Sequence, residues 1–215
     1  MLETAVRVAD EGGIEALTMR NLAEALEVEA MSIYYHVPNK EAVLDGVTEV
    51  VVREMLDATP AIADPEDEEG WKRAMRAKIL ASRQVLLRHP WAPAVMETRK
   101  ALSVAVLEYY DGVLGLFRAG GFSYDLAHHA LHALGSRAMG YAPDSFEPDT
   151  DDPGHDDPMV LLGAMKERFP HLVEMLQNVS HDAPGATLGW CDDQTEFEFG
   201  LDLMLDGLDR LRRSG

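Results

Sequence analysis

The chain has 215 residues, with 38 acidic and 19 basic side chains and one cysteine. This length suits one or two domains with a substantial hydrophobic core, and 47% apolar with 27% charged residues is a globular balance. No apolar run approaches the roughly 20 residues of a membrane helix, and the first residues lack a secretion-signal pattern. We therefore expect a soluble, cytoplasmic protein without a membrane partner. The net charge of −19 argues against wholesale coating of nucleic acid, but it permits a small, local DNA-reading surface.

Apolar residues recur with the helical period along the chain, and alternating strand patterns are not found in the sequence. The N-terminal part is predicted to form four helices, over residues 2–11, 19–26, 30–36 and 40–57. Gly12-Gly13 is expected to end the first helix. Thr18 and Asn39 are suited to cap the helices that follow them.

The polar segment 58–70 is expected to separate two domains, residues 1–57 and 58–215. The second domain is predicted to hold about five long helices, near 71–89, 102–119, 124–141, 162–177 and 196–211. Two apolar faces on the helix 102–119 predict burial on most sides, and Pro170 predicts a kink. The acidic segment 142–158 is expected to be a mobile loop; a calcium loop is rejected because Val160 occupies the twelfth template position.

Residues 18–40 carry the most specific functional signal. Two short helices joined by about three residues form the pattern of a helix-turn-helix, whose second helix can enter the DNA major groove. The positions expected to pack inside are Met19, Leu22, Ala23, Leu26, Val28, Ile33 and Val37. The next helix offers free N–H groups and Lys40, which suit a phosphate. By pattern alone, such helix pairs also occur in proteins that never touch DNA.

Three linked runs of residues resemble the signature of the TetR family of bacterial transcriptional regulators. They are Gly13-x-x-Ala16-Leu17-Thr18-Met19-Arg20-x-Leu22-Ala23, then Leu26-x-Val28, then Tyr34-x-His36-Val37-x-Asn39-Lys40-x-x-Val43-Leu44. The closing EFEFGLDLMLDGLDRL resembles the last helix of the tetracycline-repressor subgroup. The helical periodicity predicts an all-α protein with a small N-terminal unit of short helices and a larger helical domain. The resemblance implies that these are an N-terminal helix-turn-helix three-helix unit and a larger helical ligand-binding and dimerisation domain. It also implies a homodimer on a palindromic double-stranded DNA operator, released by a small-molecule effector. We expect no cofactor.

The resemblance also assigns DNA-contact roles by position. Thr18 and Arg20 correspond to phosphate contacts at the start of the second helix. The expected base-reading face, called the reading face below, consists of Ala30, Met31, Ser32 and Tyr35. The positions expected near the DNA backbone are Tyr34, His36 and Lys40.

Three positions depart from the family pattern. Glu27 replaces the usual glycine of the turn, Glu29 replaces a small hydroxyl residue or proline, and Tyr35 replaces a frequent basic residue. Residues 1–56 contain four basic and eleven acidic side chains, which is electrostatically poor for phosphate contacts. The family also has a basic arm before its first helix. Either such residues precede Met1, or the protein binds DNA weakly; the first alternative is the simpler expectation.

Candidate ligand-pocket residues in the second domain are Met96, Tyr110, His128, His132 and Arg137. His128 and His132 are four residues apart and share a helix face, but a structural metal site needs two further ligands, so we expect no metal. Packing into the core is the alternative for the aromatic and methionine positions. The last helix steps by four and three, which is typical of a helix-pairing seam and suits a dimer; intramolecular packing is the alternative.

The leading interpretation is a ligand-responsive repressor. The alternative is a small-molecule sensor with weak or lost DNA binding, which the acidic first domain suggests. An enzyme is not expected, because the sequence offers no nucleophile–base pair, no glycine-rich phosphate loop and no complete set of metal ligands.

Overall fold

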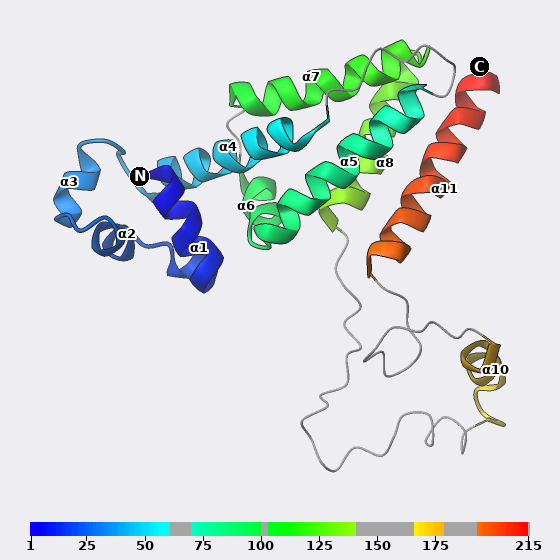
Figure 1. Cartoon of the computed structure of the whole chain (residues 1–215), viewed down its shortest axis with the longest axis horizontal. Helices are drawn as coiled ribbons and strands as arrows, with labels where there is room; N and C mark the ends of the chain where they lie inside the picture. Colours follow the sequence, from blue (N-terminus) through cyan, green and yellow to red (C-terminus); the bar gives the residue numbers. More distant parts are fainter. Residues whose placement is uncertain (61–69, 100–102, 141–165, 179–192, 215) are drawn as a thin grey trace. The chain divides into compact units, whose positions relative to one another are not determined.

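In a computed structural model of the chain, the described residues are 1–60, 70–99, 103–140, 166–178 and 193–214. All regular structure within these segments is helical (Figure 1). The chain divides into two compact units, residues 1–140 with 205–215, and residues 141–204. No helix in the described ranges combines the length and apolar character needed to cross a membrane. The expected domain boundary between residues 57 and 58 stays a prediction.

The first four helices are α1 (Leu2–Ala16), α2 (Met19–Ala25), α3 (Ala30–Tyr34) and α4 (Lys40–Ala58). Gly13 has a φ of 76°, so the expected end of the first helix is a kink after which one more turn follows. The two predicted caps are confirmed. The Thr18 hydroxyl accepts a hydrogen bond from the Asn21 N–H at 3.1 Å, and the Asn39 side chain accepts one from the Ala42 N–H at 2.9 Å.

Helix α4 joins these helices to α5 (Gly70–Arg88), α6 (Ala92–Thr98) and α7 (Val104–Ala119), because it packs against all three (Figure 1). α6 is missing from the prediction, since Pro90 and Pro93 suggested a helix stop. Pro93 instead lies in the first turn of α6, where a missing N–H costs no hydrogen bond.

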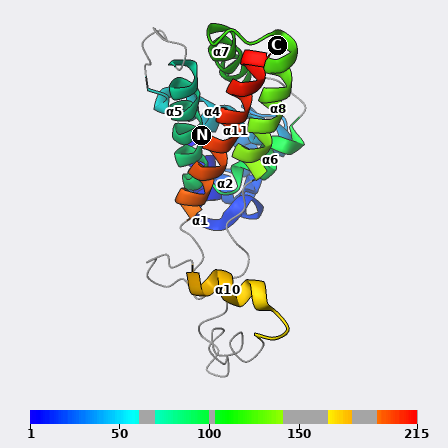
Figure 2. The same cartoon turned by 90° about the vertical axis from the view of Figure 1, so that its right-hand side faces the viewer.

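α8 (Tyr124–Gly140) packs against α7 after a tight turn (Figure 2). Gly121 has a φ of 79°, and a Cβ on Gly120 would lie 2.5 Å from Trp71 Cγ. Trp71 packs edge-on against Phe122, with ring centroids 4.6 Å apart. The glycines therefore let the α7–α8 turn close over the buried tryptophan. The expectation that the helix 102–119 is buried on most sides is wrong, because Leu107 and Tyr110 of α7 are exposed.

The remaining helices are α10 (Pro170–Asn178) and α11 (Asp193–Ser214). α10 begins at Pro170, so the proline occupies a helix start where a kink was expected. Phe197, Leu201, Leu205 and Leu208 of α11 are buried, whereas Phe199, Leu203 and Leu211 are exposed. Most of the expected linker 58–70, the acidic segment 142–158 and the first residues of the expected helix 162–177 lie outside the described residues.

Candidate nucleic-acid interface and ligand cavity

The turn between α2 and α3 is a Schellman motif, a helix end closed by two reversed hydrogen bonds. The Val28 N–H donates to the Ala23 carbonyl and the Glu27 N–H to the Glu24 carbonyl, both at 3.0 Å. Glu27 lies in the left-handed region, with a φ of 56°. The turn is therefore as tight as a helix-turn-helix requires, although no glycine is present. Val28 is exposed, which contradicts the expectation that it packs inside.

Helix α3 turns one face inward and one outward. Ile33 is buried, Val37 is buried beyond the helix end, and Ala30 is half-buried against the same apolar cluster. Met31, Ser32 and Tyr35 of the reading face are exposed, and so are Tyr34 and His36. Apart from the half-buried Ala30, the predicted DNA-contact residues in and directly after α3 thus lie on accessible surface, but their contact with DNA stays a prediction.

Two cations in the first four helices have no intramolecular carboxylate partner within the described residues. Arg20 is exposed in the first turn of α2, and Lys40 is half-buried at the first residue of α4. The other two cations of these helices, Arg7 and Arg53, form ion pairs. Arg7 pairs with Glu11 at 3.7 Å, and Arg53 pairs with Glu49 at 2.7 Å.

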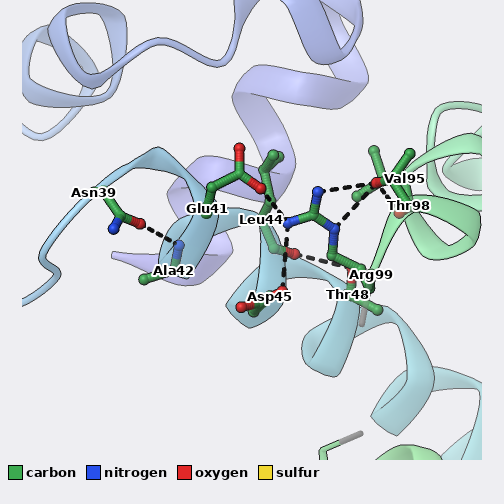
Figure 3. Close-up of polar contacts among 9 residues, drawn as sticks. All are labelled: Asn39, Glu41, Ala42, Leu44, Asp45, Thr48, Val95, Thr98 and Arg99. Atoms are coloured by element: carbon green, nitrogen blue, oxygen red, sulfur yellow. Dashed lines mark hydrogen bonds and ion pairs between the residues drawn. The ribbon is translucent and has the colours of Figure 1, made fainter. Parts of the chain in front are cut away.

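Arg99, the residue that follows α6, lies between two carboxylates of α4 (Figure 3). Its Nη1 is 2.7 Å from Glu41 Oε2 and 3.4 Å from Asp45 Oδ1, and its side chain is 13% exposed. The hydrogen bond to Glu41 raises the pKa of Arg99, with smaller electrostatic support from Asp45. The guanidinium therefore fixes the end of α6 to the first turns of α4. Sequence reasoning missed it, because the partners are 54 and 58 residues away.

A second cluster, also missed, surrounds the buried His89 between α5 and α6. Its Nδ1 is 2.8 Å from Asp10 Oδ1, and its Nε2 is 3.2 Å from Glu54 Oε2. The Trp91 indole N–H donates to the same Asp10 oxygen at 2.7 Å. These bonds join α1 and α4 to the connection between α5 and α6. The sequence does show two side chains with hydrogen-bonding groups, His89 and Trp91, on either side of Pro90, but it does not identify their partners.

An inner cavity of about 80 Å³ lies among α4, α5, α7 and α8. Its wall is apolar apart from three hydroxyl side chains, Ser82, Tyr109 and Tyr110. The Ser82 and Tyr109 hydroxyls are hydrogen-bonded to each other at 2.9 Å. Lys78 is buried beside them, with its ammonium 4.5 Å from the Tyr109 ring centroid. Burial lowers the pKa of Lys78 and raises that of Tyr109.

An outer cavity of about 460 Å³ adjoins the inner one, because Tyr110 lines both. The outer wall also includes Met96 and Glu97 of α6 and His132 of α8. Three predicted pocket residues thus meet at one cavity. His128 and Arg137 do not line either cavity; the His128 ring instead packs edge-on against that of His132, with centroids 4.7 Å apart.

Two family models match the chain. The model described as bacterial regulatory proteins, tetR family, matches residues 1–47, and the tetracyclin repressor-like, C-terminal domain matches residues 64–212. A regulator of Saccharopolyspora erythraea, named as an HTH-type transcriptional regulator, is 34% identical over 122 residues, which are 57% of this chain and 49% of that protein. The match thus spans about half of that relative.

Two similarities extend over almost the whole chain. The tetracycline repressor protein class C of Escherichia coli is 27% identical over 99% of this chain and 90% of its own. A crystal structure of a possible TetR family transcriptional regulator from Streptomyces coelicolor A3(2) has 28% identity and a TM-score of 0.72, over 98% and 97% of the two chains. With both domains matched in order, this chain belongs to the TetR family of bacterial transcriptional regulators and has a C-terminal domain of the tetracycline-repressor type.

Proposed function

We propose that the protein is a repressor that binds a palindromic operator as a homodimer and is released by a small-molecule effector. One observation carries the proposal: α6 lines the outer cavity, and the arginine that follows it forms ion pairs with the start of α4. Met96 and Glu97 lie in the cavity wall, while Arg99, two residues further on, bonds Glu41 and Asp45. A ligand that moves α6 therefore has a direct mechanical connection to the helix that carries Lys40.

The DNA side of the proposal rests on the exposed surface of the helix-turn-helix. Thr18 and Arg20 stand at the start of α2 and Lys40 at the start of α4, where N–H groups and cations suit phosphates. The reading face of α3 would enter the major groove. Displacement of α4 relative to α2 and α3 would misalign these groups, which would lower operator affinity.

The dimer part of the proposal rests on α11. Phe199 and Leu203 are 61% and 53% exposed, one helical turn apart on the same face, and Leu211 continues the stripe two turns later. Gly207 occupies the intervening position, and a Cβ there would meet nothing within 4 Å. An exposed apolar stripe with a small residue at its centre suits close packing against the same helix of a second copy.

Fluorescence anisotropy with the DNA upstream of the protein's own gene, at two salt concentrations, tests the proposal. Saturable, salt-sensitive binding that falls in Arg20→Ala and Lys40→Ala supports it. Arg7→Ala is the matched control, because that arginine already pairs with Glu11 on α1 and should leave binding unchanged. Thermal-shift screening would then provide ligands to test for release of the DNA.

A small-molecule sensor with weak or lost DNA binding is the second candidate. The excess of eleven acidic over four basic side chains in residues 1–56 favours it. Failure to bind any double-stranded DNA at either salt concentration, together with ligand stabilisation in the thermal-shift screen, would favour the sensor over the repressor.

A further inference from the structure

The outward side of α3 is apolar and aromatic rather than charged. Met31 and Tyr35 stand four residues apart and so share a face, with exposed fractions of 70% and 88%. The Tyr35 N–H donates to the Ser32 carbonyl at 3.3 Å, so the helical turn continues through Tyr35. Ile33, buried on the opposite side, fixes which face looks outward. The two largest side chains of the reading face are therefore exposed next to each other on the same side of α3.

The same stretch lacks the side chains that form bidentate hydrogen bonds to purines. No Arg, Lys, Asn or Gln occurs anywhere from Glu27 to Val37. Arginine and lysine are the usual readers of guanine, and asparagine and glutamine of adenine. The hydroxyls of Ser32 and Tyr35 both donate and accept, so they discriminate weakly among bases. What α3 offers most strongly is apolar surface.

Apolar surface in the major groove has one base-specific partner, the C5 methyl group of thymine. We propose that Met31 and Tyr35 read thymine methyl groups in each operator half-site, and that these contacts supply most of the base discrimination of α3. This inference rests on the proposed function. Glu27 and Glu29, at the N-terminal side of α3, are the competing readers, since a carboxylate accepts a hydrogen bond from the cytosine amino group.

The experiment begins with the full chain and a library of random double-stranded DNA, from which bound sequences are selected. In the selected operator each thymine is then replaced, one at a time, by deoxyuridine, which removes only the C5 methyl group. We expect at least one thymine per half-site at which the affinity falls about fourfold, the equivalent of the about 0.8 kcal/mol gained by burying one methyl-sized group.

Variants assign each methyl group to a side chain. Met31→Ala should abolish the deoxyuridine penalty at one thymine and preserve it at the other, and Tyr35→Ser should do the converse. Both side chains are exposed, so folding is not at risk. Lys40→Ala is the control: a lost phosphate contact should weaken thymine and deoxyuridine operators by the same factor.

Three results would overturn the inference. One is an operator in which deoxyuridine is tolerated everywhere. Another is a deoxyuridine penalty that Met31→Ala and Tyr35→Ser both leave intact. The third is selection of cytosine at the positions facing α3, with discrimination lost in Glu29→Ala. If no DNA sequence is enriched or bound at all, the proposed repressor function fails, and this inference fails with it.

Discussion

Glu27 occupies the one backbone conformation in the α2–α3 turn that side chains disfavour. Its φ of 56° crowds the Cβ against the backbone, at a cost of roughly 1–2 kcal/mol, part of which glycine's greater chain entropy would offset. We expect Glu27→Gly to raise the free energy of unfolding by about 1 kcal/mol. Urea denaturation measures this change.

The neighbouring glutamate provides the matched control for this change. Glu24→Gly removes the same charge from the exposed surface, but from within α2, so it should destabilise by about 0.5–1 kcal/mol. Equal effects of the two substitutions would mean that the charge, and not the left-handed backbone, governs stability at this turn.

Lys78 is a buried residue whose ammonium lies 4.5 Å from the Tyr109 ring centroid. Burial lowers its pKa from the ordinary 10.5, so the unfolded chain holds the proton more tightly than the folded chain. The resulting destabilisation is complete below the lowered pKa and disappears as the pH rises towards 10.5. We expect Lys78→Met to raise the melting temperature by about 2–4 °C at pH 7, the change that 1 kcal/mol produces in a chain of this size.

The pH dependence separates this effect from simple packing. The advantage of Lys78→Met should shrink as the pH approaches 10.5, whereas a gain from packing alone would stay constant. Lys166→Met is the control, because that lysine is exposed and its replacement should change the melting temperature little at any pH.

At the level of helices, the sequence predicts a helix start correctly where the interaction that fixes it joins residues close together in the chain. Thr18 and Asn39 bond N–H groups three residues away, and such caps are visible in the sequence itself. α6 was missed because proline breaks a helix interior but is tolerated in the first turn, and the sequence alone does not distinguish the two positions.

The residues of the candidate site also divide into those that the sequence identifies and those that it does not. Met31 and Tyr35 were assigned to the exposed face of α3 by helical spacing and family resemblance. Arg99 and His89 were not identified, because their partners lie 35 to 79 residues away in the sequence and only packing brings them together. Leu107 and Tyr110 were predicted to be buried and are exposed. An apolar pattern does not say whether a helix face packs against the same chain, a ligand or another molecule.

The His89 cluster joins α1 and α4 to the connection between α5 and α6. Removing the imidazole would take one partner from each of the Asp10 and Glu54 carboxylates, although Asp10 keeps Trp91 and Glu54 keeps Arg88. Losing hydrogen bonds to charged groups costs roughly 1.5–3 kcal/mol. We expect His89→Ala to lower the free energy of unfolding by that amount and to speed amide hydrogen exchange in α1. His129→Ala should change stability by less than about 0.5 kcal/mol, because its only carboxylate contact within the described residues is exposed and 4.0 Å long. Equal losses in the two variants would show that the cluster does not join the helices.

For the whole molecule, the excess of negative charge limits how DNA affinity depends on salt. With a formal charge of −19, DNA binding gains little from long-range attraction. The first four helices present two cations, Arg20 and Lys40, that no carboxylate of the described segments neutralises. In the proposed homodimer these residues would neutralise about four phosphates. The logarithm of the binding constant should then fall with the logarithm of salt concentration with a slope of about −3.6, a loss of about 10²-fold between 50 and 200 mM salt.

Removing one of these cations should make DNA affinity depend less steeply on salt concentration. Lys40→Ala deletes two phosphate contacts per dimer, so the slope should become about −1.8, whereas Arg7→Ala should leave it unchanged because Arg7 is already paired with Glu11. Anisotropy titrations at four salt concentrations measure both slopes. A slope near −8 in the unaltered protein would require cations outside the first four helices to reach the DNA. A slope near zero would mean that Arg20 and Lys40 do not contact phosphates, and base contacts by α3 would then have to carry the binding energy.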